Sequence, residues 1–257
     1  MGVTAPGGAL LFARYAYPPN VLGLCGPDAA GQLLEQVHAG VDDGGLRELV
    51  RGFDGAWPYL ELIAGATGLE PLDRRVVEAY WVGNDLLRQV DAAMLRRSVE
   101  DRFRPRLTRS TWPDFVESVP AAARPHHSFH VLGVYPWLGL LRAGRVDEPL
   151  QVLDRCRIRW GRVVEVGQTS ALVRSRPLVW DGRLLRLGGA RVESVVTGVS
   201  GRRLTRPLVP GDWCSLHWDW VCDRLARRDV MRLASWSALQ LEAAQGQPRP
   251  SPAMLVP

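Results

Sequence analysis

Two residues in the C-terminal half of the chain offer the soft donor atoms that iron and zinc prefer. Cys156 begins the stretch Cys-Arg-Ile-Arg-Trp-Gly-Arg-Val, and His217 ends a later stretch, Gly-Asp-Trp-Cys-Ser-Leu-His. A thiolate sulfur and an imidazole nitrogen are common ligands of both metals. The two residues therefore predict a metal-binding site, provided that the fold brings them together.

The neighbours of Cys156 favour the reactive form of its thiol. Arg155, Arg157 and Arg159 surround it in the sequence, and positive charges that face a sulfur lower its pKa. The alternative is a small buried hydrophobic residue, which is the commoner role of a single cysteine.

His217 lies in a stretch with strand-like alternation. If residues 213–223 form one strand, Cys214 and Cys222 face the core, and His217 shares the more polar face with Asp219. On that face the imidazole is accessible, or it donates to the carboxylate, which holds the ring in one tautomer. A purely structural histidine is the alternative.

A second group of histidines lies in the N-terminal half, in the run Pro-His-His-Ser-Phe-His that ends at His130. If a helix begins near the proline, His126 and His130 lie on one face at a spacing that lets two imidazoles bind one ion. Asp114 or Glu117 is a candidate third ligand. The alternative is that these histidines, with His127, cap the helix start or stack on nearby aromatic rings.

Helical spacing of apolar residues dominates from Ala9 to about Arg155. Turn and capping residues divide this half into several segments. The predicted helices cover residues 27–38, 46–53, 57–66, 72–102 with a break at Gly83-Asn84, 111–118, 126–141 and 147–154.

The period of the apolar pattern changes to two from Arg157 onward, and Asp181-Gly182 is a strong hairpin signal. The predicted strands cover residues 159–166, 171–180, 183–187, 191–199 and 213–223, and a helix follows over 225–240. Five short strands fit a small OB-like barrel better than an open sheet. The predicted fold class is α+β, with an all-helical N-terminal domain (1–154), an OB-like five-stranded β-barrel with a C-terminal helix (155–244) and a mobile tail (245–257).

Composition excludes several kinds of chemistry. All 32 residues in the Lys+Arg count are arginine, so Schiff-base catalysis and lysine-dependent phosphate loops are excluded. The net charge of +5 comes from arginines interleaved with acids, which indicates a mixed surface and argues against a nucleic-acid partner. Four widely spaced cysteines and the lack of a long apolar segment or secretion signal predict a cytoplasmic protein with reduced thiols and no membrane partner.

The two stretches that contain Cys156 and His217 together resemble the HypC/HupF family of small [NiFe]-hydrogenase maturation chaperones. That family has a Cys followed at fixed distance by a Gly and a strand, and later a Gly-Asp-aromatic strand that leads to a His. The resemblance covers residues 156–232, and here an uncharacterised helical domain precedes it, so the amino group of Cys156 lies within a peptide bond. The matching residues are Cys156, Gly161, Arg162, Val163, Gly211, Asp212, Trp213 and His217.

The resemblance implies a maturation or assembly chaperone, and so a protein without catalytic activity of its own. Cys156 and His217 would carry iron, with its cyanide and carbonyl ligands, to a hydrogenase large subunit or to another maturation protein. Residues around the two motifs would contact that partner: Gly161, Gly211, Asp212, Trp213 and Asp219.

Two other functions stay open at this point. One is a metal-dependent enzyme that uses the cluster of His126, His127 and His130 in the helical half. The other is a nucleic-acid-binding barrel, since OB-like barrels with exposed tryptophan and arginine stack single strands.

Overall fold

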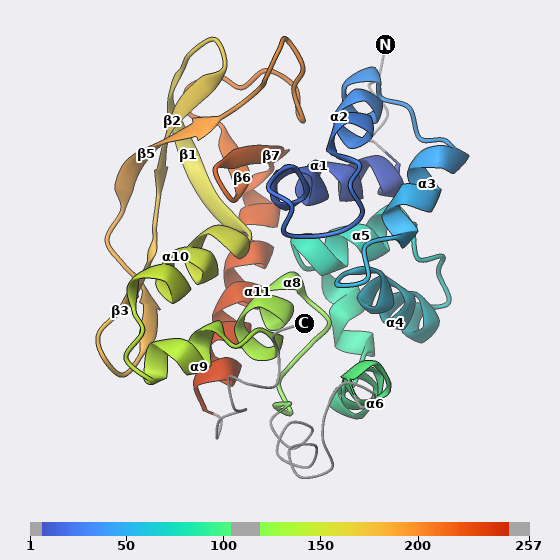
Figure 1. Ribbon diagram of the computed structural model, residues 1–257, viewed down its shortest axis with the longest axis vertical. Coiled ribbons are helices and arrows are strands. Elements are labelled where there is room, and N and C mark those ends of the chain that lie inside the picture. The colour runs from blue at the N-terminus through green and yellow to red at the C-terminus, as the bar shows by residue number, and fades with distance from the viewer. Residues whose placement is uncertain (1–6, 104–118, 247–257) are drawn as a thin grey trace.

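The computed structural model describes residues 7–103 and 119–246 (Figure 1). The first of these ranges is helical, as predicted, and Figure 1 shows it on one side of the molecule. Its elements are α1 (Gly8–Val21), α2 (Ala30–Ala39), α3 (Gly44–Arg51), α4 (Trp57–Thr67), α5 (Arg74–Trp81), the 3-10 helix η1 (Asp85–Gln89) and α6 (Ala92–Phe103).

Local sequence signals set the ends of these helices. The carboxylate of Asp43 accepts a hydrogen bond from the backbone N–H of Leu46 and caps α3, and Asp73 caps α5 in the same way. The predicted break at Gly83-Asn84 is confirmed: Gly83 has a φ of 89°, and the Asn84 side chain caps η1. A positive φ is a conformation that glycine adopts without strain.

The predicted helix over residues 126–141 is three short pieces. They are α8 (His127–Phe129), the π-helical segment η3 (His130–Val134) and α9 (Trp137–Arg142). Pro136 has no N–H to donate and precedes α9. Helix α10 (Asp147–Cys156) follows, two residues longer than predicted. The helix predicted over 111–118 lies outside the described residues, as do Asp114 and Glu117.

The C-terminal part contains a mixed five-stranded sheet and a separate hairpin. The sheet strands pair in the order β1-β2-β5-β7-β6, and β6 also pairs with β1, which closes the ring. Strands β5 and β7 pair in parallel and the other neighbours antiparallel. The strands are β1 (Arg159–Val166), β2 (Ser170–Ser175), β5 (Arg191–Val196), β6 (Trp213–His217) and β7 (Trp220–Leu225), and the hairpin consists of β3 (Leu178–Trp180) and β4 (Leu185–Leu187). The α+β class is thus confirmed.

Two of the predicted strands are divided in the structure. The segment 171–180 ends its sheet strand at Ser175, before Pro177, and continues as β3 outside the sheet. The segment 213–223 is a hairpin that turns at Trp218, whose φ is 51°. His217 lies before this turn, on the face of β6 that packs against α1, where Tyr15 contacts both Ser215 and His217. The prediction that His217 lies on a polar, accessible face is therefore wrong. His217 is buried, with 1% of its surface exposed.

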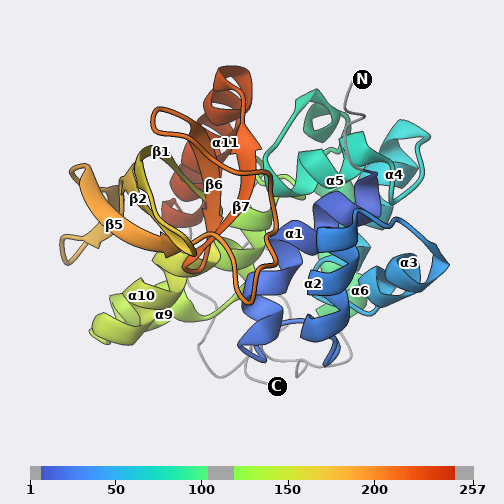
Figure 2. The ribbon, with the colours of Figure 1, turned by 90° about the horizontal axis from the view of Figure 1, so that it is seen from above.

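Helix α11 (Arg227–Gln245) ends the described chain and is longer than the predicted 225–240. Helix α11 packs on α8 and η3, and it also contacts β7, beside which Figure 2 shows it from above. The tail predicted from 245 lies, beyond residue 246, outside the described residues.

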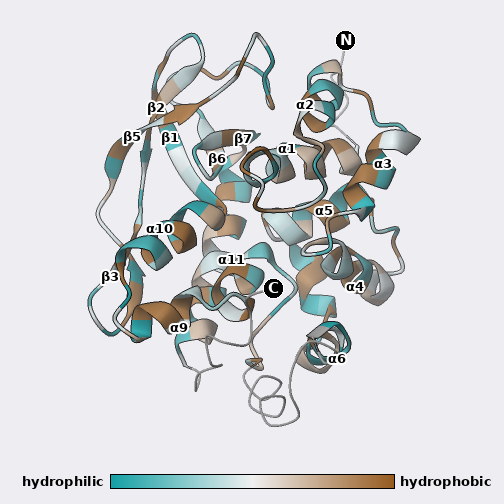
Figure 3. Ribbon diagram, viewed as in Figure 1, coloured by the Kyte–Doolittle hydropathy of each residue, from teal (hydrophilic) through white to brown (hydrophobic). Residues whose placement is uncertain are grey.

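One hydrophobic core joins the helical part to the sheet. Ile158, Cys222 and Leu233 belong to the same buried cluster as Phe12 and Tyr15. Figure 3 shows mainly hydrophobic residues along α1 and more hydrophilic ones along α10. The domain boundary at 154/155 therefore divides the sequence at the change of secondary structure, while the core extends across it.

Within residues 7–103 and 119–246, no helix combines the length and the apolar character that are needed to cross a bilayer.

Candidate metal centre

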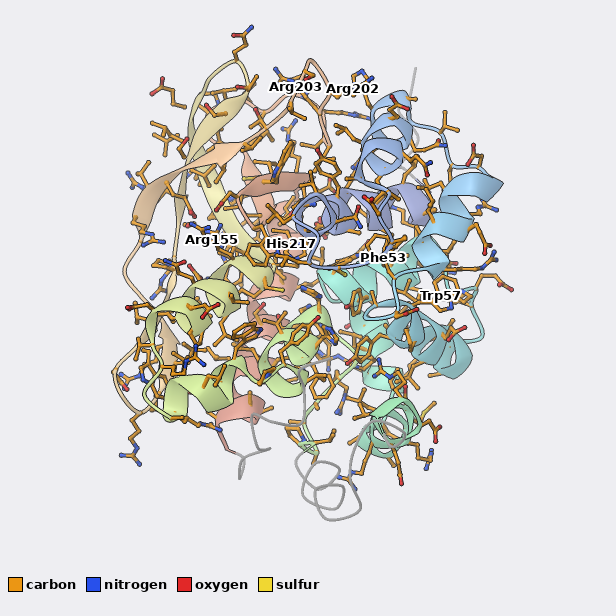
Figure 4. All side chains as sticks on the ribbon, viewed as in Figure 1. Phe53, Trp57, Arg155, Arg202, Arg203 and His217 are labelled. Atoms are coloured by element: carbon orange, nitrogen blue, oxygen red, sulfur yellow. The ribbon has the colours of Figure 1, made fainter. Side chains whose placement is uncertain are left out.

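Three donor side chains meet where the helices contact the sheet: His127 of α8, Cys156 at the end of α10 and His217 at the end of β6. One ligand atom from each lies within 4.8 Å of the other two. Figure 4 shows His217 near the middle of the molecule, between the sheet and the helices. In a tetrahedral site with ordinary Zn–S and Zn–N bonds, donor atoms lie about 3.6 Å apart. A shared ion therefore needs the donors to approach by at most about 1 Å.

Strand pairing explains why Cys156 and His217 are neighbours despite their separation in sequence. Strand β1 begins three residues after Cys156, and Arg159 pairs with Leu216 in β6. The turn after His217 is tied to the same junction, because Trp218 N–H donates to the carbonyl of Arg155 at 2.7 Å, and the Arg159 guanidinium donates to the carbonyl of Trp218 at 2.8 Å.

The His217 ring has the tautomer that a metal ligand needs. Its Nδ1 lies 2.6 Å from the carbonyl oxygen of Tyr15, and because a carbonyl only accepts, Nδ1 carries the proton. Nε2 then carries a lone pair and no proton, and this atom is buried and has no hydrogen-bond partner among the described residues. Burial, together with the neighbouring His127, lowers the pKa of His217 well below its usual value. The ring is neutral at physiological pH.

His127 uses both ring nitrogens in hydrogen bonds. Nε2–H donates to the carbonyl oxygen of Cys156 at 2.8 Å, and Nδ1 accepts from the hydroxyl of Tyr80 at 3.1 Å. Burial lowers the pKa of His127 to about 4. Either nitrogen can ligate a metal only after one of these hydrogen bonds is given up, so Tyr80 and the Cys156 carbonyl control which nitrogen is free.

The thiol of Cys156 is half-buried and protonated. Burial raises its pKa to about 12, with a further contribution from Cys25. The prediction that the flanking arginines lower this pKa is wrong, because each has an acidic partner. Arg155 pairs with Asp219 at 3.4 Å, Arg157 pairs with Asp154 at 2.9 Å, and Arg159 pairs with Glu193.

Aromatic rings surround the three donors. The Trp81 ring centroid lies 4.6 Å from that of His127 and 5.7 Å from that of His217, and Tyr80 packs against both Trp81 and His127. These rings exclude water, and a neutral thiol and neutral imidazoles are the forms that such a dry setting favours. A bound cation would reverse this balance for the thiol.

The structure does not bring His126 or His130 into this group. Nδ1 of His126 accepts from the backbone N–H of Ser128 at 3.1 Å, so His126 caps α8 instead of lying on its face. Nδ1 of His130 lies 3.2 Å from the hydroxyl of Tyr59. Capping of a helix start and contact with an aromatic ring are the structural roles that were the alternative prediction for the Pro-His-His-Ser-Phe-His segment. His127, between them, is the ligand candidate that pairing by i and i+4 spacing missed.

The residues predicted to contact a partner have clear roles in the sheet. A side chain at Gly161 would collide with Val173, and Gly211 has a φ of 93° in a turn. Asp212 pairs with Arg224 at 2.8 Å. Trp213 and Asp219 are half-buried, and the Asp219 side chain forms an ion pair with Arg155, so part of each side chain stays open to a partner.

No sequence signal indicated that Tyr15 and Tyr80 form hydrogen bonds with His217 and His127, respectively. Both are distant in sequence from the histidines that they contact, and only the packing of α1 and α5 against β6 and α8 brings them together.

Comparison with known proteins gives a family without a known activity. No curated protein and no solved structure matches the chain. One family model matches residues 4–250, and that family is described as a family of unknown function. Because the match covers nearly the whole sequence, including all three donors of the candidate centre, the chain belongs to family DUF6390.

Proposed function

We propose that the protein binds one transition-metal ion, iron or zinc, through His127, Cys156 and His217. The observation that carries this proposal is Nε2 of His217, a buried lone pair without a partner among the described residues. A ring nitrogen of His217 lies within 4.8 Å of a ligand atom from each of two further soft donors, His127 and Cys156. A buried acceptor left unpaired costs about 1–3 kcal/mol, and a metal ion removes that cost.

The donor set fits both metals in charge and type. One thiolate and two neutral imidazoles leave a divalent ion with one net positive charge and, in tetrahedral geometry, one position open. An open position is what a metal-transfer protein needs for a ligand of its cargo or of its partner.

We propose further that the bound metal is cargo for assembly of a metalloenzyme. The resemblance of residues 156–232 to the HypC/HupF chaperones supports this function, because in that family a Cys and a His together carry iron to a hydrogenase large subunit. The ring of five strands supports the likeness to a small OB-like barrel. The additional donor, His127, comes from the helical part that such small chaperones lack.

The test is metal analysis of the full chain purified without oxygen. The proposal expects iron or zinc near one equivalent, and infrared bands of cyanide and carbonyl if the cargo is a hydrogenase iron centre. Cys156→Ala should remove the metal, and Cys214→Ala, which changes a buried cysteine of the sheet core, should retain it. Metal-free protein that takes up neither Fe(II) nor Co(II) would contradict the proposal.

A metal-dependent enzyme is the second candidate, because His127 belongs to the histidine run of the helical part and also to the centre. It predicts that metal remains bound after Cys156→Ala and is lost after His130→Gln. The assembly protein predicts the opposite result for both variants.

A further inference from the structure

A second site has a lining that includes none of the three donors, although Ser128 and Arg157 in that lining follow His127 and Cys156 in the chain. It is a cavity of about 290 Å³ between the β3–β4 hairpin and α11, with Ser128 and Leu132 also lining it. Leu178, Leu185 and Leu241 form an apolar wall. Small-molecule sites are mostly apolar cavities with a few polar groups that fix orientation, and this volume suits a small ligand.

Two serines of this cavity carry hydroxyls without partners. Ser128 is 1% exposed and Ser237 is 9% exposed, and the Oγ atom of each is buried with no hydrogen-bond partner among the described residues. A buried polar group of this kind calls for an explanation such as a ligand or a water molecule. A serine hydroxyl reorients about a single torsion, so each can turn toward the cavity that it lines.

A buried guanidinium completes the polar end. Arg157 is 4% exposed and lines the cavity together with the two serines. Its Nε and Nη2 donate to a single oxygen of Asp154, at 3.2 and 2.9 Å, and Nη2 also donates to the carbonyl oxygen of Arg176 at 2.7 Å, which leaves Nη1 for a ligand. The same oxygen of Asp154 also accepts the backbone N–H of Leu178, so the carboxylate is already satisfied by donors. Glu242 also lines the cavity but is exposed, where water screens its charge.

We propose that this cavity binds a small aliphatic carboxylate. Its head group accepts hydrogen bonds from Ser128, Ser237 and the guanidinium of Arg157, and its chain lies along Leu178, Leu185 and Leu241. The site shares no residue with the candidate metal centre, so the proposal does not require a bound metal. It gives both orphaned hydroxyls an anionic acceptor, which forms stronger hydrogen bonds than a neutral one.

The test measures binding of hexanoate to the full chain by calorimetry and by the shift of the thermal unfolding midpoint. Acetate, which lacks the chain, and hexanol, which lacks the charge, are the matched probes. Hexanoate should bind at least about tenfold more tightly than either, because the charge-assisted hydrogen bonds and the apolar contacts act together.

The matched variants are Ser237→Ala and Ser235→Ala, the same change on buried and exposed faces of α11. Ser237→Ala should weaken hexanoate binding about tenfold. It should not lower the unfolding midpoint of the ligand-free chain, because it removes an unpaired hydroxyl. Ser235→Ala should leave binding unchanged.

Three results would overturn the proposal. They are no binding of hexanoate, binding of hexanol as tight as that of hexanoate, or the same change in hexanoate affinity in Ser237→Ala and Ser235→Ala. The first would leave the hydroxyls to water, and the second would make the cavity a general apolar site. A Ser237→Ala chain that is itself destabilised would show that the hydroxyl has a structural role.

Discussion

The proposed metal binding depends on how two imidazoles are held. His217 is fixed by the carbonyl of Tyr15 and His127 by the carbonyl of Cys156, so backbone groups, which mutation does not remove, set both ring orientations. Such outer contacts fix the tautomer of a ligand and raise its basicity. They also mean that the ring of His217 is ready before any ion arrives, whereas His127 must first release a hydrogen bond.

The slope of metal affinity against pH should give the number of protons that the centre releases when it binds metal. In the metal-free chain the pKa of the Cys156 thiol is about 12, and that of His127 is about 4. Between about pH 6.5 and pH 8.5 only the thiol must lose a proton to bind metal, so the apparent affinity for Co(II) should rise about tenfold per pH unit. Competition titrations at several pH values measure this slope.

The Cys156→Ala chain is the control for that slope. Without the thiol, residual binding to the two neutral imidazoles should be weaker and nearly independent of pH over the same range. A slope of about two in the unmodified chain would mean that a second protonated group also ligates.

Acid should destabilise the metal-free chain steeply. Burial lowers the pKa of His126 to about 3 and that of His127 to about 4, and it holds the pKa values of His130 and His217 well below the usual one. The unfolded chain takes up protons near pH 6.5, where the folded chain does not. Stability is therefore fully present above about pH 6.5 and is lost as the pH falls toward the folded values, by about 1.4 kcal/mol per pH unit for each histidine.

Urea unfolding at pH 7 and pH 5 tests this expectation. His38→Gln changes the fifth histidine, which is exposed, and should leave the pH dependence as it is. A free energy of unfolding that stays constant over this range would show that the buried histidines protonate without cost.

The residues of the candidate centre were only partly predictable from sequence. Residue type singled out Cys156 and His217, because soft donors are few in this chain. Their burial was not predictable, since it depends on the Trp218 turn and on α1 packing against β6. The pKa of Cys156 was misjudged because burial raises it and because each flanking arginine has an acidic partner that the sequence does not reveal.

At the scale of elements, the pairing of β1 with β6 positions the candidate centre. Close approach of β1 to β2 depends on Gly161, where an added Cβ would lie 2.3 Å from a methyl carbon of Val173 and 2.9 Å from the carbonyl oxygen of Arg174. Any displacement of β1 moves the end of α10, and with it Cys156.

Gly161→Ala should therefore lower the free energy of unfolding by about 1–3 kcal/mol, as overpacking does in a tight core. Gly189→Ala is the control, because a Cβ there meets no atom within 4 Å. Chemical denaturation of both variants gives the comparison. If Gly161→Ala leaves stability unchanged but weakens association with a partner, its predicted role in partner contact would be favoured over packing.

Element type was predictable where local signals are strong. The break at Gly83-Asn84 and the change of period after α10 were both readable, because each depends on residues next to one another. The β6–β7 turn was not, because it has no glycine or proline: Trp218 occupies a positive φ that tertiary hydrogen bonds to Arg155 and Arg159 stabilise.

At the scale of the molecule, the helical part and the sheet share one core. The ion pair of Arg14 with Asp223 at 2.9 Å and the hydrogen bond of Tyr15 with Ser215 at 2.9 Å also join α1 to the sheet. The full chain should therefore unfold in one cooperative thermal transition, although its sequence changes character at residue 155.

Calorimetry of the full chain and of a fragment of residues 155–246 tests the proposed division into domains. We expect the fragment to lack a cooperative transition, because removing the helices exposes Ile158 and Leu233 of the shared core. A fragment that folds alone would support an independent C-terminal domain with the boundary at 154/155.

If the three donors bind an ion, their location on three distant segments should also limit how fast that ion leaves. Because both imidazoles are buried, a chelator cannot reach these two ligands until the contact between the His127 and His217 rings opens. The dissociation rate of the ion would then be limited by local opening of the protein and not by the strength of the bonds to the ion. Faster release would require a partner that separates the helices from the sheet. Such a partner should increase the rate of metal exchange.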